Sequence, residues 1–239
     1  SMRTFQLLVS GTEGEWPGQL YDAESGKWVI DNAALTTALG FVDKAFNELQ
    51  VTESPAMAAD SAMGSLLTSD YMMNENIGLY ITGSWTMGQF KSQYPWDAAM
   101  DTYGMAQIPT AEGQGKGFTT MSGGWTWAIP ENSQNKDGAV EFLKYLCSYD
   151  GILARVLYNG EASPRKDVAD AEEYMNQTPS AIPYTKGQLE YACFRPSVDG
   201  YSSITASYTT AVEEVACGIE SPEGAIANLK EEMIRLFGE

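Results

Sequence analysis

The chain has 239 residues, 44% of them hydrophobic and 19% charged, which is typical of a globular protein with one large or two small domains. Its formal net charge of −18 argues against nucleic acid and anionic lipid surfaces as partners, because the negative charges repel one another. The electrostatic field of the chain would not affect the binding of a neutral ligand. The sequence contains no histidine, which excludes a Ser-His-Asp or Cys-His catalytic site and removes the commonest metal ligand.

The first residues carry no recognisable targeting segment. Ser1 and Met2 resemble the remnant of a cleaved tag joined to a designed start, so we set them aside as a tag scar. No signal peptide is visible, and no apolar run approaches the length needed to span a bilayer. The sequence could be a fragment whose export signal was removed upstream.

The first predicted elements are a hairpin and a helix. The arms of the hairpin run from Leu20 to Asp31, and Ala23-Glu24-Ser25-Gly26 supplies the turn. Asp31 or Asn32 then caps a helix that runs to about Gln50. Its apolar face recurs at spacings of three and four: Leu35, Leu39, Val42, Phe46 and Leu49. A second helix is expected within 54–69, which is rich in Ala, Ser and Met.

The middle of the chain alternates short strands with helices. Strands are predicted at Leu79–Ile81, Tyr103–Ile108 and Trp125–Ile129. Between the first strand and the helix after it, Thr82-Gly83-Ser84 favours a tight turn that ends at Trp85. A polar turn at Asn132–Asn135 caps the helix expected at about 136–148.

The last third is predicted to be helical. Ser221-Pro222-Glu223 opens the final helix, with the serine as its cap and the proline at its first position. The other helices are expected at 151–157, 168–176, 184–191 and 204–216. Because strands alternate with helices, the architecture indicated is α/β.

Polar groups that could carry chemistry have simpler interpretations. Glu13 with Glu15, or Glu213 with Glu214, could form a glycoside-hydrolysing pair, but no motif nearby would raise the pKa of one member, so solvated acidic faces are favoured. We expect Cys147, within an apolar helix, to be a buried and inert thiol. Cys193 and Cys217 could form a disulfide, which the sequence leaves open.

Four aromatic residues stand at element boundaries beside a glycine, which would let the backbone approach another molecule closely. We expect this set to be exposed in a cleft: Trp16, Trp85, Trp125 and Tyr201. Other aromatics lie inside elements and are expected in the core: Phe41, Phe46, Trp127 and Phe142.

A pyranose ring suits such residues, because its C–H face stacks on an indole while its hydroxyls need hydrogen-bond partners. Arg195 in a loop could supply a fork of donors, or equally form a surface ion pair. For Arg165 the ion pair is favoured.

Five motifs then occur in the order of one known family. They are Gly78–Trp85, Gly123–Pro130 with the helix residues Lys136, Ala139 and Glu141-Phe142-Leu143, Ser163–Asp167, Arg195-Pro196 with Gly200-Tyr201, and Gly218 with Ser221–Ala225. Together they resemble family 1 extracellular solute-binding proteins, the maltose-binding-protein-like receptors of carbohydrate ABC transporters. The resemblance runs from about Gly18 to the C-terminus.

This resemblance implies a periplasmic-binding-protein type II lobe, with a mixed sheet flanked by helices and a helical C-terminal third. It implies a sugar or oligosaccharide ligand, a membrane permease as partner, no catalysis and no metal or cofactor. Trp85 would be the stacking tryptophan, while Arg195 and Tyr201 would approach from the returning segment. The full set of expected ligand-binding residues is Trp16, Ser84, Trp85, Gly123, Gly124, Trp125, Arg195 and Tyr201.

One departure from the family concerns length, because its members usually carry most of an N-terminal lobe before this point. We therefore expect residues 3–127 and 176–239 to form a C-terminal lobe, and 128–175 to pack on a missing lobe. The apolar surface of that segment would favour self-association of the fragment. The expected location is extracellular, either periplasmic or as a cell-surface lipoprotein. The alternatives are a carbohydrate-active hydrolase domain and a binding lobe for a small molecule other than a sugar.

Overall fold

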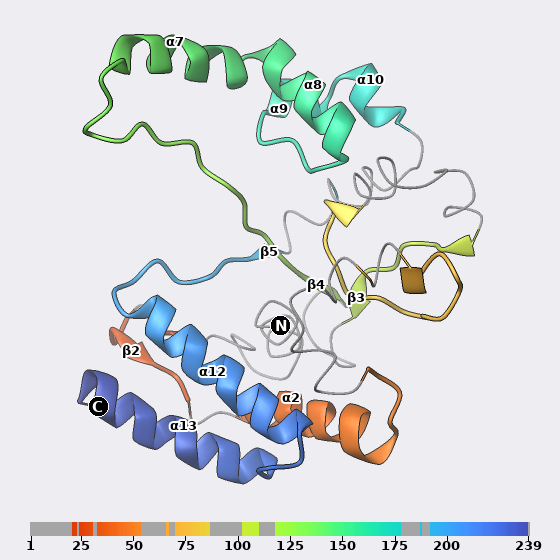
Figure 1. The fold of residues 1–239 in the computed structure, drawn as a ribbon, viewed down its shortest axis with the longest axis vertical. Helices are drawn as coiled ribbons and strands as arrows, with labels where there is room; N and C mark the ends of the chain where they lie inside the picture. Colours follow the sequence, from red (N-terminus) through yellow and green to blue (C-terminus); the bar gives the residue numbers. More distant parts are fainter. Residues whose placement is uncertain are drawn as a thin grey trace. The chain divides into compact units, whose positions relative to one another are not determined.

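The computed structural model describes residues 21–22, 24–30, 33–53, 66, 70–86, 102–109, 118–177, 187 and 192–238 (Figure 1). Its contacts divide the chain into two units. Unit 1 comprises the described residues within Ser1–Met63, Gln107–Ser122 and Tyr191–Glu239. Unit 2 comprises those within Gly64–Ala106 and Gly123–Glu190. The helices expected at 54–69 and 184–191 lie almost entirely outside the described residues.

Unit 1 begins with the predicted hairpin, which is confirmed. Strand β1 (Tyr21–Asp22) pairs antiparallel with β2 (Lys27–Trp28). The carboxylate of Asp22 accepts hydrogen bonds from the Glu24 amide at 2.9 Å and the Ser25 hydroxyl at 2.5 Å. These bonds hold the pKa of the Asp22 carboxyl below its ordinary value, because they favour the ionised form. Gly26 then takes the left-handed backbone conformation, with φ +73°, that closes the turn.

A three-stranded mixed sheet also belongs to unit 1. Strand β4 (Phe118–Met121) lies between β3 (Ile108–Pro109), its antiparallel partner, and β5 (Ala192–Cys193), its parallel partner. Two predicted strands are wrong, since Leu79–Ile81 and Trp125–Ile129 pair with no strand of the described chain. The strand predicted at Tyr103–Ile108 is also largely wrong, since only Ile108 of it belongs to a strand. An apolar run can predict extended backbone, but a strand also needs a neighbour to accept its hydrogen bonds.

Three helices form the core of unit 1. Helices α12 (Tyr201–Ala216) and α13 (Pro222–Phe237) pack on each other and on α2 (Ala33–Asp43), and Figure 1 shows the three side by side. The predicted cap of the last helix is confirmed, because the Ser221 hydroxyl accepts a hydrogen bond from the Gly224 amide at 3.0 Å. The buried side chains recur at the spacing of one helix face: Leu35, Leu39 and Val42 on α2, Ile204, Tyr208, Ala211 and Val215 on α12, and Ala225, Leu229 and Met233 on α13.

Helix α2 ends in a π-helical segment, η1 (Lys44–Glu48). The side-chain amide of Asn47 donates to the Asp43 carboxylate at 2.8 Å and to the Val215 carbonyl at 2.9 Å, which ties this segment to the end of α12. The prediction that Leu49 belongs to the inner face is wrong, because its side chain is exposed. A π-helical turn takes more residues than an α-helical one, so it shifts the phase of the stripe after Val42.

Between residues 136 and 177, where unit 2 is fully described, it contains four helices: α7 (Lys136–Leu146), α8 (Tyr149–Asn159), α9 (Lys166–Ala169) and α10 (Glu172–Met175). The last two replace the single helix predicted at 168–176. A small core joins them, formed by Ile152, Val156, Val168, Ala171 and Tyr174. The Tyr174 hydroxyl donates to the Glu161 carbonyl at 3.1 Å and accepts from the Ser163 amide at 3.0 Å, so the loop before α9 is fixed to this core.

Helix α7 starts as predicted but packs differently. Asn135 caps it by accepting a hydrogen bond from the Gly138 amide at 3.1 Å. None of its residues is buried, and Phe142 is 60% exposed. The prediction that Phe142, Trp127 and Phe41 lie in the core is therefore wrong, since all three are exposed. Phe46 alone of that set packs against the core.

The thiols also differ from expectation. Cys147, at the C-terminal end of α7, is exposed rather than buried, because the helix that carries it has no buried face. Cys217 is an exposed free thiol, so it forms no disulfide with Cys193. None of the helices in the described ranges combines the length and apolar character needed to cross a membrane.

Candidate binding site

The loop that carries Trp85 is closed by two hydrogen bonds. The hydroxyls of Thr82 and Thr86 share a hydrogen bond of 2.6 Å, and the Thr86 amide donates to the Gly83 carbonyl at 3.1 Å. Thr86 is only 3% exposed, so this part of the loop is anchored inside unit 2. The loop therefore holds its tryptophan at a fixed point of the surface.

The indole of Trp85 lies against Gly83. A Cβ atom on Gly83 would stand 2.5 Å from Cε3 of the indole and closer still to two other ring carbons. Gly83 is not among the glycines with positive φ, so the ring, and not the backbone conformation of the turn, requires a glycine here. Trp85 is 43% exposed, as predicted, which leaves part of its ring open to a ligand.

Gly124 and Trp125 lie in an extended segment that leads to α7. Trp125 is 85% exposed, which confirms the predicted exposure. A Cβ atom on Gly124 would meet nothing within 4 Å, and its φ is not positive. Among the described residues, neither packing nor a positive φ requires glycine at this position.

Arg195 and Tyr201 belong to unit 1. Arg195 is exposed, and no hydrogen bond or ion pair joins its guanidinium to another residue in the described part of the chain. Tyr201 opens α12 and is only partly exposed, and its hydroxyl oxygen is buried without a hydrogen-bond partner. The side chains of Trp85 and Trp125 are therefore exposed, whereas that of Tyr201 is exposed only in part.

The expected ligand-binding residues thus fall in both units. Unit 2 holds five of them: Ser84, Trp85, Gly123, Gly124 and Trp125. Unit 1 holds Arg195 and Tyr201, and Trp16 lies outside the described residues. The structure defines the local surroundings of each set within its own unit.

The loop before α9 shows the structural role that was favoured for Arg165. Its guanidinium donates to both carboxylate oxygens of Asp167, at 2.9 and 2.6 Å, and to the Cys147 carbonyl at 3.0 Å. This fork lowers the pKa of the Asp167 carboxyl and raises the pKa of Arg165. Within the described residues, no three His, Cys, Asp or Glu side chains gather where they could hold a metal ion.

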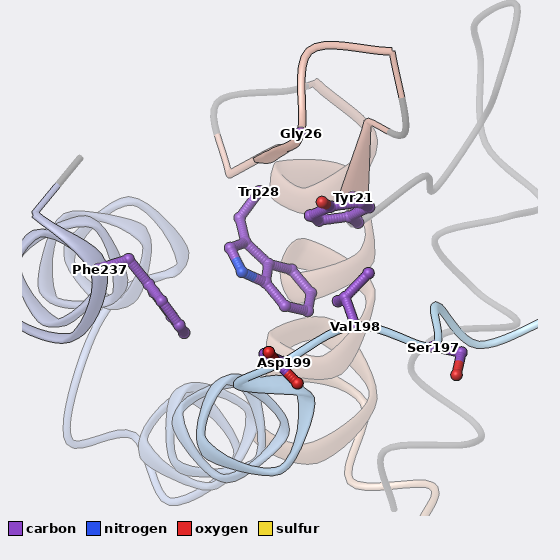
Figure 2. A pocket seen from close by; sticks show the side chains of 7 residues that line it. All are labelled: Tyr21, Gly26, Trp28, Ser197, Val198, Asp199 and Phe237. Carbon is purple, nitrogen blue, oxygen red and sulfur yellow. The ribbon is translucent and has the colours of Figure 1, made fainter.

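Unit 1 also contains a hollow that the sequence did not predict, which we call the aromatic hollow (Figure 2). Its volume is about 690 Å³. Its described lining residues are Tyr21, Gly26 and Trp28 of the hairpin, Ser197, Val198 and Asp199 before α12, and Phe237 at the end of α13. The sequence feature that could have indicated it is Trp28, because a short hairpin is too small to bury a tryptophan side chain alone.

Three rings shape the aromatic hollow. Tyr21 and Trp28 meet edge to face, with ring centroids 5.2 Å apart and planes at 70°. Trp28 and Phe237 lie 6.0 Å apart with planes at 33°. Figure 2 shows the indole between the other two rings, with Val198 and Asp199 at one edge. Gly200 makes room for this arrangement, because a Cβ atom there would stand 2.7 Å from Cζ of Phe237.

Solved structures of similar fold identify the fold type. A maltose-bound MalE3 of T. maritima has 23% sequence identity and a TM-score of 0.72, over 92% of this chain and 54% of that one. A solute-binding protein of Thermotoga lettingae bound with α-D-tagatose has 22% identity and a TM-score of 0.79, over 98% and 56% of the two chains. The GacH receptor of Streptomyces glaucescens, solved unliganded and with acarbose, has 17% identity and a TM-score of 0.77, over 92% and 54%. The expected type II periplasmic-binding fold is thus confirmed.

The chain belongs to the bacterial extracellular solute-binding protein family, whose model matches residues 4–151. The predicted family resemblance is thereby confirmed. The chain spans about half the length of the solved structures that it matches. No curated protein gives a significant sequence match. Both the family and these neighbours are binding proteins rather than enzymes.

Proposed function

We propose that this chain is part of the substrate-binding component of a carbohydrate ABC importer, and that it binds a sugar or oligosaccharide without catalysis. The observation that carries the proposal is the partly exposed indole of Trp85 on its closed loop, in a chain of the solute-binding family. An anchored aromatic plate loses little conformational entropy when a pyranose stacks on it. The sugars bound by proteins of similar fold support this ligand class.

The remaining expected residues have distinct proposed roles. Ser84 and the backbone at Gly123 and Gly124 would donate and accept hydrogen bonds, and Trp125 would present a second ring. Arg195 would contribute a guanidinium that has no partner in the described chain. Tyr201 would orient the returning segment, because its hydroxyl oxygen is buried. Trp16, outside the described residues, completes the proposed set.

We also propose that residues 128–175 form an interface with a further lobe, and that 3–127 and 176–239 form the C-terminal lobe. Helix α7 supports this proposal because it has no buried residue and exposes Phe142 and Tyr145. An uncovered apolar face of this kind favours association with another surface or with a second copy of the chain. The expected location is extracellular, periplasmic or as a surface lipoprotein, with a membrane permease as partner.

The test is a calorimetric titration of the full-length protein with a panel of mono- and oligosaccharides. Trp85→Ala should weaken sugar binding at least about tenfold, since it removes the stacking plate. Gly83→Ala should weaken it similarly, because the new Cβ expels the indole from its position. Trp127→Ala is the matched control, since Trp127 is also exposed but lies outside the proposed set. Equal affinities of the Trp85→Ala variant and the wild type would contradict the proposed stacking role.

The hydrolase alternative is separated by assaying reducing-end release with the same sugars. We expect none, since a binding protein returns its ligand unchanged. Turnover by the full-length protein would overturn the proposal. If no sugar in the panel binds and another small molecule does, the lobe would instead be a binding domain for that class of ligand.

A further inference from the structure

The loop that carries Trp85 is the end of a longer stretch of chain that no sheet supports. Residues 77–86, which we call the Trp85 arm, belong to no strand, and the side chain of Leu79 near its middle is 78% exposed. Neither a ladder of strand hydrogen bonds nor burial of Leu79 therefore restrains the arm. Because an unrestrained backbone samples many conformations, the position of the indole depends on how the two ends of the arm are held.

Tyr103 holds the first end of the arm. Its hydroxyl donates to the carbonyl oxygens of Met72 and Ile77, which lie 2.8 and 3.0 Å away and share its one proton. Met72 is only 7% exposed, and its carbonyl also accepts a hydrogen bond from the Glu75 amide at 3.1 Å, which closes a turn. Tyr103 therefore fastens the first residue of the arm to a turn that has a buried side chain in unit 2.

Two threonines hold the other end of the arm. The hydroxyls of Thr82 and Thr86 lie 2.6 Å apart and share one hydrogen bond across the loop. Thr86 is 3% exposed, so water could not easily replace this bond at its hydroxyl, whereas Thr82 is exposed. Trp85 directly precedes Thr86, and its ring lies against Gly83. The shared bond therefore joins residues on either side of the indole.

We propose that Thr82, Thr86 and Tyr103 are positioning residues for sugar binding, which hold the Trp85 arm so that the indole stands in place before the sugar arrives. The proposal rests on the proposed function, in which Trp85 is the stacking plate, and the three residues act through that plate. When a ligand binds only one conformation of a protein, its apparent affinity falls in proportion to the fraction of molecules in that conformation. Loss of either set of hydrogen bonds should lower this fraction without changing the ring that stacks on the sugar.

The first test needs no ligand. Fluorine NMR of the full-length protein labelled with 7-fluorotryptophan places the probe on Cζ2, which is not among the three ring carbons nearest Gly83. The signal of Trp85 is identified by its absence from Trp85→Phe. Thr86→Val keeps nearly the same side-chain shape and removes the hydroxyl, so we expect the Trp85 signal to move toward the position of free 7-fluorotryptophan.

Matched variants separate the hydrogen bond from the side chain that makes it. Thr86→Ser retains a hydroxyl and should leave the Trp85 signal at its wild-type position. Thr82→Val and Tyr103→Phe should move the signal in the same direction as Thr86→Val. Thr37→Val is the control, because Thr37 is exposed like Thr82 and its hydroxyl also makes a hydrogen bond, of 2.8 Å, but it lies on α2 in unit 1. A Trp85 signal that stays unchanged in both Thr82→Val and Thr86→Val would overturn the proposal.

The second test is a calorimetric titration with the sugar of the panel that the wild type binds most tightly. Thr82→Val and Thr86→Val should each weaken binding about fivefold, and the double variant should bind no more weakly than either, because both changes break the same bond. Tyr103→Phe should weaken binding about threefold. Circular dichroism melts establish that each variant is folded. Effects of the two threonine changes that multiply in the double variant would contradict the shared bond.

The outcomes distinguish this proposal from the function on which it rests. If Trp85→Ala weakens sugar binding and the two threonine variants do not, the indole is the stacking plate but these residues do not position it. If no sugar in the panel binds to the wild type, the proposed function is wrong, and the fluorine signals of the variants still decide whether these residues hold the indole.

Discussion

Replacement of Gly200 by alanine should destabilise unit 1 in two separable ways. Gly200 has φ +80°, in the left-handed region that a residue with a Cβ adopts at a cost of about 1 kcal/mol. The new Cβ would also stand 2.7 Å from Cζ of Phe237, and closer to Cε1, where ordinary contacts begin near 3.4 Å. The ring must therefore shift by most of an ångström from its position beside Trp28.

The magnitude follows from adding the two effects. Overpacking of this kind costs about 1–3 kcal/mol, so with the backbone cost Gly200→Ala should lose about 2–4 kcal/mol of unfolding free energy. Gly218→Ala is the matched control. Gly218 has φ +65°, and its nearest neighbour, Asn47 Oδ1, would lie at an ordinary 3.7 Å from the new Cβ. That variant should lose only the backbone part, about 1 kcal/mol.

The assay is urea denaturation followed by far-ultraviolet circular dichroism, with both variants compared with the wild type. The double variant Gly200→Ala with Phe237→Ala should be less destabilised than the sum of its single changes, because the ring that clashes is gone. Strict additivity, or equal losses for Gly200→Ala and Gly218→Ala, would refute the argument that Phe237 occupies the space a Cβ would need.

Three further predictions concern stability. Leu35→Ala should cost about 2–5 kcal/mol in the same denaturation assay, because Leu35 is fully buried between helices of unit 1, and a loss below about 1 kcal/mol would contradict that packing. Ser221→Ala should cost about 1 kcal/mol through loss of the α13 cap, while Ser221→Asp should restore most of it. Asp167→Asn should lower the melting temperature near neutral pH, and this difference should shrink as the pH falls below 3.8. Hydrogen bonds from Arg165 hold the folded pKa of Asp167 below its ordinary 3.8, so the stabilisation is present above 3.8 and lost as the pH falls through the folded value. A melting difference independent of pH would contradict this last assignment.

The starts of α7 and α13 could be predicted closely because their signals are local. Ser221 with Pro222 marks the start of α13, and Asn135 marks the start of α7, through hydrogen bonds made within a single turn. The buried positions of α2 and α13 also follow from spacing, since a helix face that is apolar along its length is usually covered.

Burial of α7 could not be predicted in the same way. Its apolar residues show that some surface should cover them, but spacing does not specify which surface or whether it belongs to this chain. Phe142 and Cys147 are exposed for that reason. The strand predicted at Trp125–Ile129 is wrong for a related reason, because pairing depends on a neighbour that no local pattern specifies.

The exposure of Trp85 was predicted from the sequence. Trp85 at a boundary beside glycine indicated an exposed ring, and the structure shows one. The role of Gly83 could not be predicted from the sequence, because it depends on the indole of Trp85 lying in space where a Cβ would be. The aromatic hollow was missed because its rings come from residues 21, 28 and 237, which no sequence motif relates to one another.

The two exposed thiols have a practical consequence. Cys147 belongs to unit 2 and Cys217 to unit 1, so each unit carries an exposed thiol that a reagent can label. With Cys193 changed to serine, a pair of spin labels on these two positions would form a molecular ruler between the units. Distance distributions recorded with and without sugar would then report directly whether ligand brings the units to a single separation.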